Sequence, residues 1–325
     1  MDGASLVDAA LELPVFTSFT RLGYDARSRV DHWTPLDRYD LTGRVVVVTG
    51  ATSGLGRVGA EQMARCGATV VLWGRDRDKT ERVRDEIAAA TGNTTLEVAL
   101  ADTGDLDAVR AAAAGIAAAH ERVDALVHNA GALTADRRTV PGGLEATIAS
   151  QVVGPFLLTS LLLDRLRGTA PGRVVTMSSG GMYASPLRVT DLQMGDDYNG
   201  TEQYARAKRA QVTLNEMWAQ RVPKDEVVFH AMHPGWADTP GVEASLPTFR
   251  KVVGRLLRTP EQGADTMVWL VADDGAPKAT TGEFWLDRRP RSIHKLPKTK
   301  RSDTAERRQR LWDWVADAAG VDPVG

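Results

Sequence analysis

The sequence predicts an α/β protein in which helices flank a doubly wound, seven-stranded parallel sheet within a single domain. Short runs rich in β-branched and apolar residues recur along the chain, with helical stretches between them. A glycine-rich turn also follows the first run directly. The runs expected to form strands are residues 45–48, 69–73, 96–100, 123–128, 173–178, 227–232 and 282–286.

The helices expected between these strands carry ordinary helix signals. The turn after the first strand opens an amphipathic segment that ends at Gly67. Residues 108–120 are rich in alanine and follow Asp105, which is suited to cap a crossover helix. Residues 152–163 form the longest apolar run. They end at Asp164, well short of the roughly 20 residues needed to cross a bilayer, so we expect a core helix.

Two segments fall outside this pattern. They divide the chain into an N-terminal extension (1–43), a core domain (44–287), and a basic linker with a C-terminal helix (288–325). The aromatic cluster of the extension could pack on the domain, on a second subunit or on a membrane surface, and packing on the domain is favoured. The Arg- and Lys-rich stretch is most simply a solvated linker, with an anion or lipid-headgroup site as the alternative. The aromatic cluster of the N-terminal extension comprises Phe16, Phe19, Tyr24 and Trp33.

The composition argues against several classes of protein. The formal net charge is −2 and the sequence pI is about 6.3, so no attraction to nucleic acid is expected. The single cysteine, Cys66, excludes an intrachain disulfide and is expected to be a reduced, buried thiol. The six histidines are scattered, which gives no sign of a metal site. The first residues do not resemble a secretory signal, so we expect a cytoplasmic protein.

The glycine-rich turn at residues 49–56 predicts a dinucleotide-binding site. The pattern Thr-Gly-x-x-x-Gly-x-Gly follows an apolar strand and opens a helix, so glycines stand where the backbone must bend and approach a pyrophosphate. The free N–H groups of the helix N-terminus would face that charge. A purely structural turn is the alternative. The expected cofactor contacts here are Gly50, Ser53, Gly54, Leu55 and Gly56.

The end of the next strand indicates which dinucleotide binds. A carboxylate at position 74 would bond the adenosine ribose hydroxyl of NAD, and Gly74 removes it. Arg75 offers a planar guanidinium that matches a 2′-phosphate. We therefore expect NADP(H) rather than NAD(H), with a solvated Arg75 as the alternative.

Tyr204 and Lys208 form a candidate pair for proton transfer. Positions i and i+4 share one face of a helix, so the Lys208 ammonium can reach the region of the Tyr204 hydroxyl. A nearby positive charge lowers the pKa of a phenol from its usual value of about 10, which makes Tyr204 usable near neutral pH. The alternative for Tyr204 and Lys208 is an exposed pair of side chains on a helix. For Ser179, which lies at the end of a predicted strand, the alternative is that its hydroxyl only satisfies backbone groups there.

With these motifs, the chain resembles the short-chain dehydrogenase/reductase family, whose members have a Rossmann-like fold. The turn at residues 128–131 resembles the family's Asn-Asn-Ala-Gly motif with His in first place, and Ser179, Tyr204 and Lys208 match its catalytic residues. The resemblance implies hydride transfer between nicotinamide and a carbonyl carbon. Tyr204 would donate the proton, Ser179 would hold the oxygen, and Lys208 would bond the nicotinamide ribose. The cofactor contacts that the resemblance implies are Leu100, Asn129, Ala130, Gly131, Tyr204, Lys208, Pro234, Gly235 and Thr239.

Three positions depart from the family pattern. Gln151 stands where the family has a catalytic asparagine, and its side chain is one methylene longer. Gln151 is therefore expected in the catalytic group, where it either serves the water relay from Lys208 in a different rotamer or closes it. Ala99 replaces an adenine-side aspartate and leaves the backbone N–H of Leu100 to serve. His128 is expected to pack and bond locally rather than to titrate.

Together these features predict an NADP(H)-dependent oxidoreductase that acts on an apolar ketone, aldehyde or alcohol. Residues 133–143, 181–200 and 236–258 are expected to wall the substrate pocket with apolar side chains and little fixed charge. The alternative is a catalytically weak dinucleotide-binding protein with a regulatory or membrane-peripheral role. Gln151 and the two terminal extensions motivate it. The sequence does not indicate the number of subunits.

Overall fold

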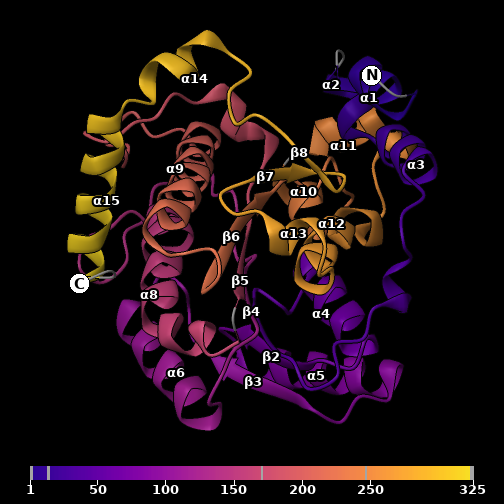
Figure 1. The fold of residues 1–325 in the computed structure, drawn as a ribbon. Coiled ribbons are helices and arrows are strands. Elements are labelled where there is room, and N and C mark those ends of the chain that lie inside the picture. The colour runs from indigo at the N-terminus through magenta and orange to yellow at the C-terminus, as the bar shows by residue number, and fades with distance from the viewer. Residues whose placement is uncertain (1–2, 13–14, 170, 246, 323–325) are drawn as a thin grey trace.

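The computed structural model describes residues 3–12, 15–169, 171–245 and 247–322, which form one α/β domain around an eight-stranded sheet (Figure 1). Seven strands run parallel in the order β3-β2-β1-β4-β5-β6-β7, which confirms the doubly wound sheet. The sheet has one strand more than the seven predicted, because the short strand β8 (Arg289–Pro290) also pairs with β7, in the antiparallel direction. The parallel strands are β1 (Val45–Thr49), β2 (Thr69–Gly74), β3 (Leu96–Leu100), β4 (Ala125–His128), β5 (Gly172–Met177), β6 (Val227–Met232) and β7 (Phe284–Leu286).

The strand order reverses between β1 and β4. Val46 of β1 lies beside Val70 of β2 on one side and beside Ala125 of β4 on the other. These residues are buried, as in parallel strands that are covered by helices on both faces. Because the strand order reverses between β1 and β4, the loops that follow these two strands diverge. Open α/β sheets bind their ligands at such a point.

Helices cover both faces of the sheet and divide the core into two layers (Figure 1). One face carries α4 (Gly54–Arg65), α5 (Arg77–Thr91) and α12 (Pro260–Ala272). The other carries α6 (Leu106–Ala119), α8 (Gly154–Arg167) and α9 (Gly200–Arg221). Asp105 caps α6 as expected, because its side chain accepts the Ala108 N–H at 3.1 Å. The shorter elements are α7 (Ala146–Ile148), the π-helical turn η2 (Ala149–Val153), η3 (Gly180–Ala184), α10 (Pro240–Ser245), α11 (Pro247–Val253), η4 (Gly254–Leu256) and α13 (Ala276–Ala279).

The most apolar helical stretch of the chain belongs to the core. Ala146–Arg167 joins α7, η2 and α8, and by length and composition alone its 22 residues could cross a membrane. In the fold, 78% of its most apolar window is buried, and the helix packs against α6 and α9. This packing confirms the expectation of a core helix there.

The first part of the basic stretch after β7, residues 288–291, is not a solvated linker. Asp287 and Arg288 turn the chain into β8 with φ values of 56° and 54°, which a tight hairpin turn requires. The Arg288 guanidinium bonds both carboxylate oxygens of Asp265 at 2.8 Å, and only 5% of its side chain is exposed. Arg291 pairs with Asp8 of the N-terminal extension at 2.6 Å. The simplest interpretation of these arginines is therefore wrong, because buried or half-buried carboxylates pair with them.

The N-terminal extension packs on the core domain through its aromatic residues, as the favoured interpretation expects. The Phe19 ring lies 4.4 Å from the His233 ring and 5.7 Å from the Trp236 ring, in edge-to-face contacts. Tyr24 and Trp33 make a similar contact at 5.2 Å. The α-helices of the extension, which are α1 (Gly3–Glu12), α2 (Val15–Phe19) and α3 (Arg21–Val30), lie near α11 (Figure 1). The short η1 (Leu36–Arg38) instead lies against α4 and α12.

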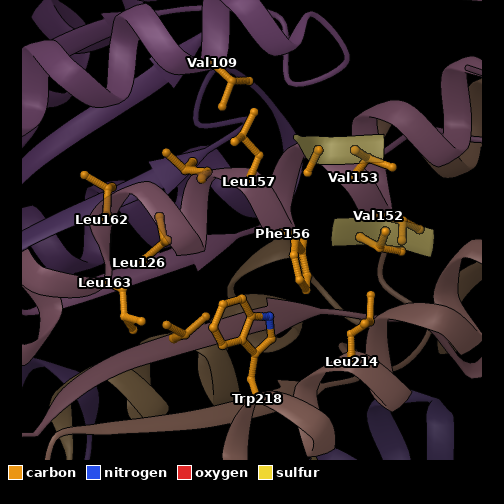
Figure 2. Close-up of a cluster of buried hydrophobic side chains, with 14 of the residues drawn as sticks. Val109, Leu126, Val152, Val153, Phe156, Leu157, Leu162, Leu163, Leu214 and Trp218 are labelled. Atoms are coloured by element: carbon orange, nitrogen blue, oxygen red, sulfur yellow. The ribbon is translucent and has the colours of Figure 1, made fainter. Parts of the chain in front are cut away.

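The C-terminal residues add a helical layer outside α8 and α9. After α14 (Pro297–Ser302), α15 (Ala305–Ala319) lies along these two helices (Figure 1). Thr304 caps α15 by accepting the Arg307 N–H. The Trp312 ring lies 4.9 Å from the rings of both Phe156 and Trp218, whose side chains face one another in the core (Figure 2).

We expect Trp312→Ala to lower the free energy of unfolding by about 3–5 kcal/mol, the usual loss when a large buried aromatic side chain is truncated. Trp314→Ala is the matched control, because Trp314 lies on the same helix but is only half-buried. Urea denaturation of both variants measures the difference. Equal losses in the two variants would contradict the packing role of Trp312.

Candidate active site

The glycine-rich turn lies between the carboxyl end of β1 and the start of α4. Gly50 and Gly54 have φ values of 66° and 53°, in the left-handed region that only glycine adopts readily. Ser53 occupies the N-cap position but makes no side-chain bond to the first turn of α4. The Leu55 side chain, in the first turn of α4, packs against the hydrophobic core. The N–H groups that open α4 are therefore not capped by Ser53, which suits an anion site.

Hydrogen bonds join this turn to the end of β4. The Thr49 hydroxyl donates to Val127 O at 3.2 Å and accepts the N–H groups of Asn129 and Ala130 at 3.0 and 3.1 Å. The Asn129 side chain in turn donates to Thr49 O at 3.0 Å and to Gly50 O at 3.3 Å. The end of β4 therefore holds the backbone of the turn from both sides.

The turn leaves no room for a larger residue at Gly50 or Gly56. A Cβ on Gly56 would lie 2.3 Å from Asn129 Nδ2 and equally close to Gly50 O. Thr239, from the loop after β6, faces the same turn, since its Cβ lies 3.8 Å from the place of a Cβ on Gly54. The two loops expected to contact a dinucleotide are therefore adjacent.

The neighbouring strand ends form the expected adenine side. Gly74 at the end of β2 lies opposite Leu100 at the end of β3. A Cβ on Gly74 would lie 2.2 Å from Thr80 Oγ1, so a carboxylate side chain does not fit there without a shift of Thr80. The Arg75 side chain follows with 80% of its surface exposed, 3.7 Å from a carboxylate oxygen of Asp102.

Ser179, Tyr204 and Lys208 come together between the end of β5 and the first turns of α9. Ser179 is the second residue after β5, and its hydroxyl accepts the Gly181 N–H at 3.2 Å. Tyr204 and Lys208 are one helical turn apart on α9. The Lys208 ammonium donates to Met177 O at 2.9 Å and lies 5.3 Å from the centre of the Tyr204 ring.

The protein environment favours the neutral forms of this pair. Burial raises the pKa of Tyr204 above its usual value, and a hydrogen bond with Ser179 opposes that rise. Burial lowers the pKa of Lys208 to about 7. The sequence predicts that the pKa of Tyr204 is lowered. In the protein without a bound cofactor that prediction is wrong, because burial of the phenol raises its pKa.

Gln151 lies in the π-helical turn η2, next to the same group. Its side-chain N–H donates to Ala132 O at 2.7 Å, and its backbone oxygen accepts from the Gln211 side chain at 2.6 Å. Gln151 Oε1 and Lys208 Nζ lie 2.9 and 3.4 Å from the place where Gly131 would carry a Cβ. Both side chains thus approach the Cα of Gly131, and Gln151 Oε1 has no hydrogen-bond partner among the described residues.

His128 bonds locally, as the sequence predicts. Its Nε2 lies 2.8 Å from the Thr159 hydroxyl. Burial lowers the pKa of His128 to about 3, so the imidazole is neutral in the physiological range. Among the described residues, no group of three or more His, Cys, Asp or Glu side chains is placed to hold a metal ion.

The loop after β6 is held from behind by residues that sequence reasoning missed. Gly235 has a φ of 73°, and a Cβ there would lie 2.2 Å from Arg258 Nε. The Arg258 guanidinium donates to Pro234 O at 3.3 Å and to Phe19 O at 3.0 Å. It also bonds both carboxylate oxygens of Asp287.

Asp287 lies at the centre of the ion-pair cluster that supports the loop after β6. Its side chain is fully buried and pairs with Arg27 at 2.6 Å as well as with Arg258. Burial acts to raise the pKa of Asp287, but the two guanidinium groups overcome it and hold the pKa below its usual range. The only signal of this cluster in the sequence is the charge-rich segment after the last expected strand.

A glycine-rich turn at the point where the strand order reverses, in a fold that also carries a Tyr and Lys pair on α9, is typical of a dinucleotide-binding oxidoreductase with a Rossmann-like fold. The family model described as short chain dehydrogenase matches residues 44–248. The chain belongs to this family, whose members bind a nicotinamide dinucleotide.

The individual relatives match most of the chain. It is 37% identical over 290 residues to dehydrogenase/reductase SDR family member 12 from Homo sapiens, covering 89% of this chain and 90% of that protein. It is 33% identical over 283 residues to retinol dehydrogenase 12 from Bos taurus, covering 86% and 88%. A solved structure from Escherichia coli CFT073, complexed with NADPH, superimposes with a TM-score of 0.64 and 25% identity, covering 79% of this chain and 100% of that one.

We expect Gly56→Ala to weaken dinucleotide binding, because the added methyl group collides with Gly50 O and the Asn129 amide. A strain of about 1–3 kcal/mol raises the Kd for NADPH roughly 5- to 150-fold. Gly115→Ala in α6 is the matched control, because nothing lies within 4 Å of the new methyl group. Fluorescence titration with NADPH measures both, and a wild-type Kd for Gly56→Ala would refute the close approach.

Proposed function

We propose that this oxidoreductase uses NADP(H) and reduces an apolar ketone or aldehyde, or oxidises the corresponding alcohol. The observation that carries the proposal is the meeting of Ser179, Tyr204 and Lys208 beside the dinucleotide turn. A bound nicotinamide supplies or accepts the hydride at the substrate carbon. The remaining chemistry falls to the side chains of the protein.

These side chains divide the proton chemistry among them. Ser179 would hold the substrate oxygen with its hydroxyl, and Tyr204 would donate a proton to that oxygen as the hydride arrives at the carbon. Lys208 would bond the nicotinamide ribose and return a proton to Tyr204. A Lys208 pKa of about 7 suits this exchange, because both forms of the amine are populated near neutral pH.

Backbone N–H groups and residues at the carboxyl ends of β1, β2, β3, β4 and β6 would hold the dinucleotide. The turn around Gly50 and Gly54 would bind the pyrophosphate, while Arg75 would pair with the 2′-phosphate of NADP. The collision between Thr80 and any side chain at Gly74 supports this choice, because it disfavours the carboxylate that NAD would need. Further contacts are proposed for Ser53, Leu55, Gly56, Leu100, Asn129, Ala130, Gly131, Pro234, Gly235 and Thr239.

Aromatic side chains near the loop after β6 support an apolar substrate. The Trp236 ring lies 5.0 Å from the Phe249 ring and 5.8 Å from the Phe16 ring, which brings α2, α11 and this loop together. Aromatic walls of this kind contribute to apolar binding sites. We propose a cytoplasmic location, consistent with the burial of the apolar stretch Ala146–Arg167.

Tyr204→Phe should lower kcat for carbonyl reduction by about 10²- to 10⁴-fold, because the phenol proton is lost while the ring remains. NADPH affinity should be unchanged. Tyr39→Phe is the control, since the Tyr39 hydroxyl bonds Asp273 at 2.8 Å, away from this site. Steady-state assays with a panel of apolar aldehydes measure the change. Wild-type turnover in Tyr204→Phe would refute its role, and NADPH binding without turnover in the unaltered protein would favour the catalytically weak alternative.

Arg75→Ala should raise the Kd for NADPH about 10- to 100-fold and leave the Kd for NADH unchanged, because only the 2′-phosphate offers a charge-assisted bond. Arg77→Ala is a suitable control, since Arg77 is also exposed but pairs with Glu81 at the start of α5. Parallel titrations with the two dinucleotides provide the comparison. An equal loss for both would contradict selection by Arg75.

A further inference from the structure

A groove lies where the segment after η3 meets the first turns of α15. Its volume is about 240 Å³. Residues 186–191 form one wall, and Arg307 and Arg310 of α15 form the other. None of its lining residues is a proposed catalytic or cofactor contact. Figure 1 shows α14 and α15 along one edge of the molecule, so this groove is a feature separate from the candidate active site.

Hydrogen bonds hold both walls of the groove in place. The Leu187 N–H donates to Ser302 Oγ at 2.8 Å, and the backbone oxygen of Ser302 accepts from Arg307 at 3.3 Å. Ser302 is the last residue of α14 and is buried. Arg206 of α9, whose side chain is only 7% exposed, donates to Asp191 O. The groove therefore has a fixed shape before any ligand binds.

Positive charge predominates in the lining of the groove. Its charged side chains are three guanidinium groups and one carboxylate, which belong to Arg188, Arg307, Arg310 and Asp191. The Asp191 carboxylate lies 3.0 Å from the Arg188 guanidinium and 3.5 Å from that of Arg206, so it is shared between two cations. It therefore neutralises Arg188 only in part.

The two arginines of α15 remain able to bind an anion. Among the described residues, no carboxylate lies within ion-pair distance of Arg307. Arg310 lies 2.7 Å from Glu306, but both side chains are largely exposed. Exposed pairs of this kind contribute little, so an anion that contacts both arginines can replace the pair.

The size and lining of the groove indicate which anion fits. The planar guanidinium fork bonds the oxygens of a phosphate in pairs, which favours phosphate over a halide or another point charge. Pro186, Leu187 and Val189 add an apolar surface, and Val189 also packs against the core. The volume is below the roughly 300–1,000 Å³ of sites for drug-sized ligands, so the ligand is small.

We propose that this groove binds a phosphate monoester. Its phosphate lies between Arg307 and Arg310, and its carbon part contacts Pro186 and Val189. A soluble phosphate ester and the headgroup of a phosphatidate lipid present the same chemical group, and the experiments below distinguish them. The proposal adds a ligand site to the oxidoreductase and does not depend on its proposed activity.

The site is tested by isothermal titration calorimetry of the full chain with glycerol 3-phosphate at constant ionic strength, with and without NADP⁺. We expect saturable binding in both cases, because the groove shares no residue with the proposed dinucleotide site. Inorganic phosphate should bind more weakly, since it lacks the carbon part. Binding that disappears when NADP⁺ is added would place the ester at the glycine-rich turn instead and overturn the proposal.

Single charge changes should alter this affinity in opposite directions. Arg307→Ala and Arg310→Ala should each raise the Kd for glycerol 3-phosphate roughly 10- to 100-fold, because each removes charge-assisted hydrogen bonds. Asp191→Asn should lower the Kd about 1.5- to 5-fold, because Arg188 loses a competing carboxylate.

Arg82→Ala is the matched control, because it removes the same charge from an exposed position on α5, outside the groove. Its Kd should equal that of the unaltered protein. A wild-type Kd in both Arg307→Ala and Arg310→Ala, or an equal loss in Arg82→Ala, would overturn the proposal.

Co-sedimentation with vesicles identifies the source of the phosphate group. Vesicles of phosphatidylcholine alone are compared with vesicles that also contain an equal part of phosphatidate. Sedimentation that requires phosphatidate and is lost in Arg307→Ala supports the lipid headgroup. Binding of glycerol 3-phosphate without such sedimentation supports a soluble ester. Failure of both ligands to bind would refute the site, whereas an absence of carbonyl reduction would leave these readouts unchanged.

Discussion

The hydrogen bonds between Thr49 and Asn129 join β1 to β4 where the strand order reverses, and the rest of the site depends on this junction. The Thr49 hydroxyl and the Asn129 amide satisfy backbone groups that the diverging loops would leave unpaired in a buried place. With the turn fixed, α4 begins at Gly54 and presents its N-terminus to the same edge on which β5 delivers Ser179. The pairing of β1 with β4 and the conformation of the glycine-rich turn therefore depend on the same hydrogen bonds.

Ion pairs connect the segments at both ends of the core domain to the loops of the site. Asp287 is buried between Arg27 of the N-terminal extension and Arg258, whose guanidinium supports the loop after β6. Removal of one partner from such a cluster leaves a buried charge uncompensated, which is far more costly than the loss of a surface pair. The extension is thus part of the structure that holds Pro234 and Gly235, and α15 covers the opposite side of the core.

The sequence predicts the features that depend on local patterns. The parallel strands, the glycine-rich turn and the spacing of Tyr204 and Lys208 are local, because burial on both faces and the backbone geometry of the turn constrain nearby residues. The ion pair between Arg27 and Asp287 joins residues 260 positions apart, and the charge-rich segment around Asp287 does not indicate which residue pairs with it. β8 is only two residues long, too short for periodicity to reveal. The pKa of Tyr204 depends on burial at the assembled site, which spacing along one helix does not report.

The central claim is that the Tyr204 hydroxyl lies at the substrate oxygen, beside the carbon that faces the nicotinamide of a dinucleotide held by the turn after β1. A crystal structure of the protein with bound NADP⁺ tests it most directly. The account predicts the pyrophosphate at the N-terminus of α4 and the nicotinamide ring between Tyr204 and the loop that carries Pro234. A dinucleotide bound elsewhere, or a Tyr204 side chain turned away from the nicotinamide, would contradict it.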